Sequence, residues 1–309
     1  MNTTNFQNSP QAGYAAKRKA ANTAIYIILA VLGVIWLFPI IWLILTSFDG
    51  ETGAVTRSLI PTNWSFNNYI KLFVQYETDA NGNEVQVAAD AMQFPYMQWI
   101  LNTLFVAVCS CVISTLLVLM VSYTFSRLRF KSRKTFLNMG LILGMFPGFM
   151  SMVAVYAIMK VLGLTNSLIG LIIVYSAGAG LGYQVAKGFF DTIPHALDEA
   201  AKIDGATRHQ IFWQIILPLS KPIIVYTALT TFMGPWGDYI FVSYFMDQNP
   251  YGWTVARGLY EMIDNKENIN EWFKPFCAGA VIIAIPITTL FLIMQRFYVG
   301  GMTGGAVKG

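Results

Sequence analysis

Six apolar segments, each long enough to cross a lipid bilayer, dominate this sequence of 309 residues. They span approximately residues 24–45, 99–123, 136–161, 168–186, 222–239 and 276–297. A helix rises about 1.5 Å per residue, so about 20 residues cross a hydrocarbon layer roughly 30 Å thick. Apolar residues make up 55% of the chain and charged residues 12%, which is typical of membrane proteins rather than of soluble domains. We therefore predict an all-α integral membrane protein with six transmembrane helices.

The basic residues predict how these spans are oriented. Most Lys and Arg side chains fall in alternate connecting segments, including residues 17–19 before the first span and residues 127–134 between the second and third. Because basic loops stay in the cytoplasm, this alternation predicts a multi-pass protein of the cell membrane with both termini cytoplasmic. The first span is too long for a cleaved signal peptide, and we interpret it as an uncleaved anchor.

The predicted spans divide the chain into a cytoplasmic tail (1–23), a six-span domain (24–299) and a glycine-rich cytoplasmic tail (300–309). Within the domain, segments 46–98 and 246–275 are predicted to be external loops, and segment 191–221 a cytoplasmic loop. Each external loop is either a solvated linker or a docking surface for an external protein.

Three of the spans contain residues that interrupt helices. These are Pro147 and Gly148 in the third span, Gly178, Gly180 and Gly182 in the fourth, and Gly234 and Pro235 in the fifth. Proline removes a backbone donor that lipid cannot replace, so such breaks must face protein or a water-lined path. Close packing of helices through small residues is the other explanation.

The cytoplasmic loop 191–221 is polar although the segments on either side are apolar. Pro194 suits the first position of a helix, and the carboxylates that follow it favour the N-terminal half. Gly205 suits the left-handed residue that ends a helix, and Thr207 can cap a second helix with an apolar stripe. The loop therefore predicts two short helices joined by a tight turn. The alternative is an amphipathic hairpin resting on lipid, but its polar first half lacks the basic excess of such helices.

The same loop resembles the EAA loop of ABC-importer permeases. The matching residues are Glu199, Ala200, Ala201, Gly205, Ile215, Leu217 and Pro218, with Asp204 and Ala206 on either side of the glycine as in sugar importers. The six-span layout and the Trp236-Gly237-Asp238-Tyr239 sequence also resemble the MalG-like subunits of maltose and oligosaccharide importers. Gly237 departs from that family, which more often has asparagine there. The resemblance implies the MalG/MetI-like permease fold with cytoplasmic EAA coupling helices.

The resemblance also implies a mechanism and a set of partners. In that family the EAA helices sit in a cleft on a separate ATPase and transmit its closure to the transmembrane helices. Glu199 would pair with a basic group of the ATPase, and Ala200 and Ala201 would allow close seating. The implied partners are a second, MalF-like permease, two MalK-like ATPases, an extracellular or periplasmic solute-binding protein, membrane lipid and a carbohydrate, with no nucleic acid. ATP and Mg²⁺ would be bound by the ATPase and no cofactor by this chain.

Two further sets of candidate residues follow from the resemblance. The possible translocation pathway comprises Tyr175, Tyr226, Trp236 and Asp238, although helix packing explains the aromatic residues equally well. Asp238 is a candidate because ionisable groups near a span are expensive to keep there, and a position in the outer headgroup region is the alternative. The possible ATPase-contacting tail comprises Gly300, Gly301, Gly304 and Gly305, and a flexible tail is the alternative. Among solutes, a maltodextrin-type oligosaccharide fits the resemblance best.

Other functional classes lack their sequence signals. The chain has no G-x-x-x-x-G-K phosphate loop, and its two histidines form no metal-binding cluster. The three cysteines suggest neither a disulfide framework nor a metal site. An ion-gradient-driven transporter would need intramembrane charges and internal repeats, and a membrane enzyme would need catalytic carboxylates at the membrane surface. A non-catalytic transport subunit is therefore the leading hypothesis, and an ABC permease for a non-sugar solute or a secondary transporter is the alternative.

Overall fold

We describe the chain from a computed structural model. The structure describes residues 10–54, 58–79, 82–178, 182–246, 249–264 and 266–306. Its longer helices are α1 (Pro10–Ser47), α3 (Tyr96–Arg127), α4 (Arg133–Gly144), α5 (Gly148–Val161), α6 (Leu168–Gly178), α11 (Lys221–Gly237) and α14 (Lys266–Ala306). Its shorter helices are α2 (Asn67–Phe73), α7 (Tyr183–Asp191), α8 (His195–Ile203), α9 (Arg208–Gln210), α10 (Leu217–Leu219), α12 (Ile240–Phe245) and α13 (Val255–Glu261). One hairpin pairs β1 (Tyr76–Thr78) with β2 (Glu84–Gln86), with Tyr76 opposite Gln86.

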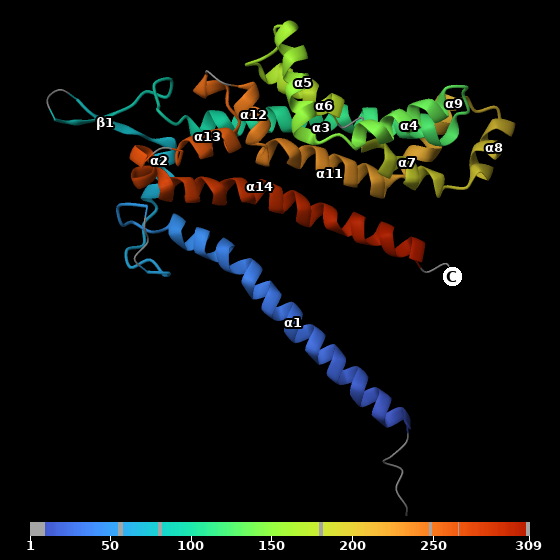
Figure 1. Cartoon of the computed structure of the whole chain (residues 1–309), viewed down its shortest axis with the longest axis horizontal. Helices are drawn as coiled ribbons and strands as arrows, with labels where there is room; N and C mark the ends of the chain where they lie inside the picture. The colour runs from blue at the N-terminus through green and yellow to red at the C-terminus, as the bar shows by residue number, and fades with distance from the viewer. Residues whose placement is uncertain are drawn as a thin grey trace, which may run out of the picture.

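The body of the molecule is a bundle of helices that run along its long axis (Figure 1). Helix α3 lies in the middle and packs against α11, α6 and α7, while α14 packs against α11 and α2. The hairpin and α2 lie at one end of this body, and α7, α8 and α9 lie at the other (Figure 1). The C-terminal half of α14 runs toward the end that carries α7 to α9.

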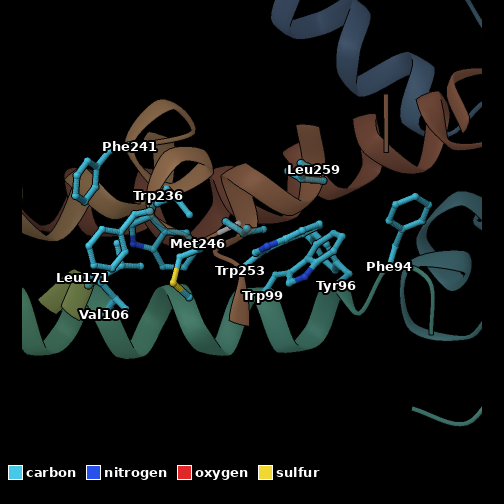
Figure 2. Close-up of a cluster of buried hydrophobic side chains, with 14 of the residues drawn as sticks. Phe94, Tyr96, Trp99, Val106, Leu171, Trp236, Phe241, Met246, Trp253 and Leu259 are labelled. Atoms are coloured by element: carbon cyan, nitrogen blue, oxygen red, sulfur yellow. The ribbon is translucent and has the colours of Figure 1, made fainter. Parts of the chain in front are cut away.

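The apolar side chains form two buried clusters along this axis. The larger cluster contains Trp99, Trp236 and Trp253, which pack between α3 and the C-terminal third of the chain (Figure 2). The smaller one contains Val118 and Leu119 of α3 together with side chains from α7, α8 and α11. Because α3 contributes to both clusters, this helix is the axis on which both ends of the molecule are built.

Helix α1 contacts α14 near its own C-terminal end, and its N-terminal part projects from the body at an angle (Figure 1). No side chain in its most apolar stretch is buried. At the end where α1 joins the body, the Asp49 carboxylate pairs with Lys274 Nζ at 2.8 Å, and both side chains are almost fully buried. Lys274 also donates to the Glu51 carbonyl at 2.7 Å. The exposed apolar surface of α1 requires lipid or another protein around it.

Three predicted spans lie inside single long helices. The spans 24–45, 99–123 and 276–297 fall within α1, α3 and α14, and each of these helices is long and apolar enough to cross a membrane. Counting each of three bent helix pairs as one span raises the number to as many as six within the described residues. The three single-helix spans are thus observed as predicted.

The third predicted span is interrupted where Pro147 and Gly148 predicted a break. It is divided into α4 and α5, which are bent by 106° at residues 145–147. Pro147 has the extended backbone angles φ −58° and ψ 131°, which a continuing helix cannot accommodate. Proline lacks the amide hydrogen that would bond to the preceding turn, so the sharp bend follows from the sequence Pro147-Gly148.

The interruption predicted at Gly234-Pro235 is wrong, because α11 continues through Pro235 to Gly237. A proline removes one hydrogen bond to the previous turn, and so close to the helix end few later bonds are affected. In the fourth span, α6 and α7 flank residues 179–181, so Gly180 lies outside the described residues. Gly182 precedes α7 directly.

The predicted external loops contain more regular structure than linkers would. Segment 46–98 contains α2 and the β-hairpin, a small exception to the all-α prediction, and its Trp64 and Phe66 remain exposed. Segment 246–275 contains α13 and the start of α14. The glycine-rich segment expected to be a tail is helical as far as Ala306, where it continues α14.

Candidate functional site

The predicted cytoplasmic loop forms a helical hairpin at the end of the body opposite the β-hairpin (Figure 1). Pro194 stands just before α8 rather than within it, with the backbone angles φ −57° and ψ 131°. The turn after α8 has φ +81° at Gly205, a left-handed value that favours glycine. Thr207 then caps α9, because Gln210 N–H donates to Thr207 Oγ1 and Thr207 N–H donates to Gln210 Oε1. The two predicted helices and their glycine turn are therefore present.

A buried arginine joins this hairpin to the end of α3. The Arg127 guanidinium Nε lies 3.3 Å from Asp198 Oδ2, and the two side chains are only 3% and 8% exposed. Arg127 Nη2 also donates to the carbonyls of Phe190 and Ile193, at 3.0 and 2.7 Å. One cation thus holds three points of the chain around the start of α8. Such a group fixes the position of the helix, because moving it would leave charges and carbonyls unpaired in a buried place.

A second polar contact lies beside the first. Asp191 accepts hydrogen bonds from Ser126 Oγ and from Lys187 Nζ, both at 2.6 Å. Burial alone would raise the pKa of the Asp191 carboxyl, but these hydrogen bonds and the charges of Lys187 and Arg133 hold it below its ordinary value. Asp191 is therefore an anion at neutral pH and ties the end of α7 to α3.

The second half of the hairpin packs on α3 through aromatic rings. The rings of Tyr123 and Phe212 lie with their centroids 4.8 Å apart, and Tyr123 donates a long hydrogen bond of 3.4 Å to the Arg208 carbonyl. Residues 211–216 form a π-helix, and the half-buried Ile215 and Leu217 pack against the smaller cluster. Both halves of the hairpin are thus attached to the same transmembrane helix.

The outward surface of α8 carries several of the predicted coupling residues. Glu199, Ala200 and Asp204 are exposed at helical spacing, and Ile203 beside them is 86% exposed. We call these four residues the α8 surface. A fully exposed isoleucine next to two carboxylates and a small residue is suited to a protein partner with an apolar and basic surface.

Ala201 does not belong to this surface. Its side chain is buried in the smaller cluster, and its carbonyl accepts a hydrogen bond of 2.9 Å from Ala206 N–H. The expectation that both alanines leave space for a partner is therefore wrong for Ala201, whose small size serves packing within the chain. Gly205 and Pro218 are exposed, whereas Ala206 is half-buried.

The candidate pathway residues divide between two places. Tyr175 Oη donates to Asp238 Oδ2 at 2.9 Å, and Asp238 Oδ1 accepts from Phe241 N–H at the start of α12. Trp236 lies buried in the larger cluster near Phe241 (Figure 2), and its indole nitrogen has no partner among the described residues. Tyr226 packs instead against the smaller cluster. The structure therefore brings Tyr175, Trp236 and Asp238 into one region but not Tyr226.

Gly300, Gly301, Gly304 and Gly305 form the last turns of α14. Their role toward a partner stays a prediction. Among the residues that the structure describes, no group of three or more His, Cys, Asp or Glu side chains could hold a metal ion.

The sequence analysis missed two important residues, one at the end of α3 and one in the hairpin. Arg127 was counted only as one basic residue among many, although its place directly after a long apolar span was a usable signal. Ile203 stands four residues after Glu199, so helical periodicity places it beside the EAA residues. The same periodicity puts Asp198 and Ala201, three apart, together on the buried side.

Three long apolar helices, broken helices beside them and a helical hairpin attached to α3 are the features of a membrane-embedded transport subunit. Residues 124–303 match the family model described as "Binding-protein-dependent transport system inner membrane component". The chain is 35% identical over 285 residues to the galactooligosaccharides transport system permease protein GanQ of Bacillus subtilis, covering 92% of this chain and 94% of the relative. It is 34% identical over 296 residues to the maltodextrin transport system permease protein MalD of Streptococcus pneumoniae, covering 95% and 98%.

The fold also matches a solved structure. A chain of a bacterial ABC transporter involved in the import of the acidic polysaccharide alginate superposes with a TM-score of 0.74 at 21% identity, over 96% of this chain and all of that one. The protein belongs to the family of binding-protein-dependent transport system inner membrane components. It is a permease subunit of an ABC importer of the MalG type, and it is not the subunit that hydrolyses ATP. Such an importer includes a solute-binding protein and an ATPase.

Proposed function

We propose that this subunit moves an oligosaccharide into the cytoplasm and that it is driven by an ATPase that docks on the α8 surface. The observation that carries the coupling part is the Arg127–Asp198 pair, which ties the helix bearing Glu199 and Ile203 to α3. Because α3 packs against α6, α7 and α11, a force on α8 reaches most of the bundle through one buried contact. ATP and Mg²⁺ belong to the ATPase in this proposal.

The choice of an oligosaccharide rests on the relatives, whose names specify galactooligosaccharides and maltodextrin. A maltodextrin-type sugar is our first choice and a galactooligosaccharide is the second. The importer would contain a second, MalF-like permease and two MalK-like ATPase subunits. Both termini and the hairpin would face the cytoplasm, and segments 46–98 and 246–275 would face the binding protein outside.

The test is uptake in a strain that lacks this chain and receives it from a plasmid. Labelled maltodextrins, galactooligosaccharides and a non-sugar solute such as methionine are compared at equal expression. We expect uptake of one oligosaccharide class only. Uptake of methionine alone would overturn the sugar assignment.

A charge reversal tests the coupling part separately. Glu199→Lys should reduce both uptake and the amount of ATPase that copurifies in mild detergent, because it places a cation where the partner's basic group docks. The matched control is Glu84→Lys in the exposed β-hairpin at the other end of the molecule, which should keep the ATPase bound. Equal ATPase retention in both variants would contradict docking on α8.

A further inference from the structure

A polar cavity of about 800 Å³ lies beneath the helical hairpin. Its walls come from the end of α3, the start of α4 and the helices α8 and α9, which all meet at one end of the molecule (Figure 1). Five basic and three acidic side chains line it, which leaves a surplus of two positive charges before His195 is counted. The cavity thus lies where the transmembrane bundle meets the coupling helices.

Two of the three acidic side chains that line this cavity already have ion-pair partners within the chain. Asp198 pairs with Arg127, and Asp191 is held by Lys187 and Ser126. Glu199 belongs to the exposed α8 surface. The positive surplus is therefore concentrated in the remaining cations rather than spread over the cavity.

Four basic side chains of the wall have no ion pair within the described parts of the chain. They are Arg129, Arg133, Lys202 and Arg208. The guanidinium Nε of Arg133 is buried and has no hydrogen-bond partner there. A buried donor without a partner is costly, and Arg127 Nε in the same wall also makes no hydrogen bond, so this wall has donor capacity that the described residues do not use.

The start of α4 adds to the attraction for an anion. The helix begins at Arg133 and has 12 residues, and the preceding Ser132 makes no side-chain capping bond. The Arg133 amide donates to the Phe130 carbonyl, so this helix start contributes mainly the positive end of its dipole. Guanidinium groups and helix N-termini are the groups that bind phosphate oxygens in proteins.

We propose that this cavity binds a phosphate group, carried either by the headgroup of an anionic phospholipid or by inorganic phosphate. The ligand would connect Arg133 on one side with Lys202 and Arg208 on the other. It would thereby fasten the coupling hairpin to the α3–α4 turn, in addition to the Arg127–Asp198 pair. The site is independent of the solute carried, and in the predicted topology it would lie near the cytoplasmic lipid headgroups, whose anionic members attract basic protein surfaces.

The experiment uses the purified importer complex that contains this chain, stripped of excess lipid. In the first arm, phosphate is titrated against chloride at constant ionic strength, and the thermal unfolding midpoint is followed. In the second arm, native mass spectrometry counts the phosphatidylglycerol and phosphatidylcholine molecules retained from mixed nanodiscs. Saturable stabilisation by phosphate identifies a free anion, and retention of phosphatidylglycerol over phosphatidylcholine identifies a lipid headgroup.

Two double variants, each of which removes two positive charges, test whether anion binding depends on the cations of the cavity. Arg133→Gln with Arg208→Gln removes two cavity cations, and we expect binding to weaken at least about tenfold. Lys131→Gln with Lys134→Gln removes two exposed cations that do not line the cavity, and we expect less than about a twofold change. The single variant Lys202→Gln removes an exposed cavity cation, so it keeps the fold and should weaken binding severalfold.

The result can overturn the proposal in either of two ways. If neither phosphate nor phosphatidylglycerol binds saturably to the parent complex, the cavity is not an anion site. If the two double variants weaken binding equally, the attraction comes from the diffuse positive charge of the cytoplasmic surface. Unequal loss in the expected direction, supported by Lys202→Gln, establishes the site.

Discussion

Single residues carry the connection between the hairpin and the bundle. Arg127 is nearly fully buried and holds Asp198 together with two backbone carbonyls. Gly205 supplies a backbone angle that other residues reach only with strain. The connection between hairpin and bundle depends on a few side chains, so single substitutions can test protein stability and the proposed coupling separately.

Arg127→Met should destabilise the protein by about 3 kcal/mol or more, because it leaves Asp198 as a buried charge without a partner. Thermal unfolding of the purified protein, together with limited proteolysis of residues 191–221, measures the effect. Adding Asp198→Leu to this variant should restore part of the loss, since the unpaired charge is then gone. The exposed Lys131→Met is the control and should change stability by less than about 0.5 kcal/mol. An Arg127→Met protein as stable as the control would refute the buried connection.

Substitutions at Gly205 should act through the backbone alone, because no atom lies within 4 Å of an added Cβ. At φ +81° we expect Gly205→Asn to be tolerated best, Gly205→Ala to cost about 1 kcal/mol and Gly205→Val to cost the most. Uptake and retention of the ATPase should fall in the same order. Normal uptake by Gly205→Val at parental expression would argue that the turn is not needed for coupling.

At the scale of one helix, α8 has two sides with different tasks. Its buried side contains Asp198 and Ala201, and its exposed side contains Glu199, Ala200 and Ile203. The adjacent alanines of the EAA pattern therefore differ: Ala201 packs within this chain, whereas Ala200 is exposed and, in the proposed function, lets a partner approach.

A pair of identical substitutions tests this division. Ala201→Leu should overpack the smaller cluster and cost about 1–3 kcal/mol in stability. Ala200→Leu should leave the unfolding midpoint unchanged but reduce the ATPase that copurifies, because the new side chain projects from the exposed side. The comparison needs both readouts for both variants. The division is wrong if Ala200→Leu unfolds early or if Ala201→Leu loses only the ATPase.

The sequence predicted the positions of the apolar helices better than the places where these helices are interrupted. The six apolar segments and the glycine turn of the hairpin were readable because hydrophobic length and a left-handed position are local properties. Pro147 bends the chain sharply, whereas Pro235 lies within α11, near its end, without ending it. Both are prolines in apolar spans, so local sequence alone could not distinguish a break from a tolerated proline.

At the scale of the whole molecule, the bundle has one end with the β-hairpin and one end with the helical hairpin, and α1 projects from the body (Figure 1). The apolar side chains along α1 are exposed, so lipid or another protein must cover them. The Asp49–Lys274 pair fixes α1 to α14 at the end with the β-hairpin. The orientation of this axis in the membrane is the prediction that remains most open to a direct test.

Cysteine labelling would measure this orientation. In a chain whose Cys109, Cys111 and Cys277 are replaced, Tyr76→Cys and Ile203→Cys place single thiols at exposed positions at the two ends. A membrane-impermeant maleimide should label Tyr76→Cys in intact cells and Ile203→Cys only after permeabilisation, because basic segments remain inside. The reverse pattern would invert the topology, and with it the docking site.

The order of amino acids was enough to predict a membrane-spanning helical protein with a glycine-turned helical hairpin, because apolar length, charge bias and helix-ending glycine act over short stretches of chain. Packing in three dimensions decided the remaining features. It buried Ala201 and left Ala200 exposed, gave Arg127 a buried structural role and gathered unpaired basic groups from the α3–α4 turn, α4 and the hairpin around one cavity. These outcomes depend on contacts between residues about 60 or more positions apart, and such contacts form only when the bundle closes.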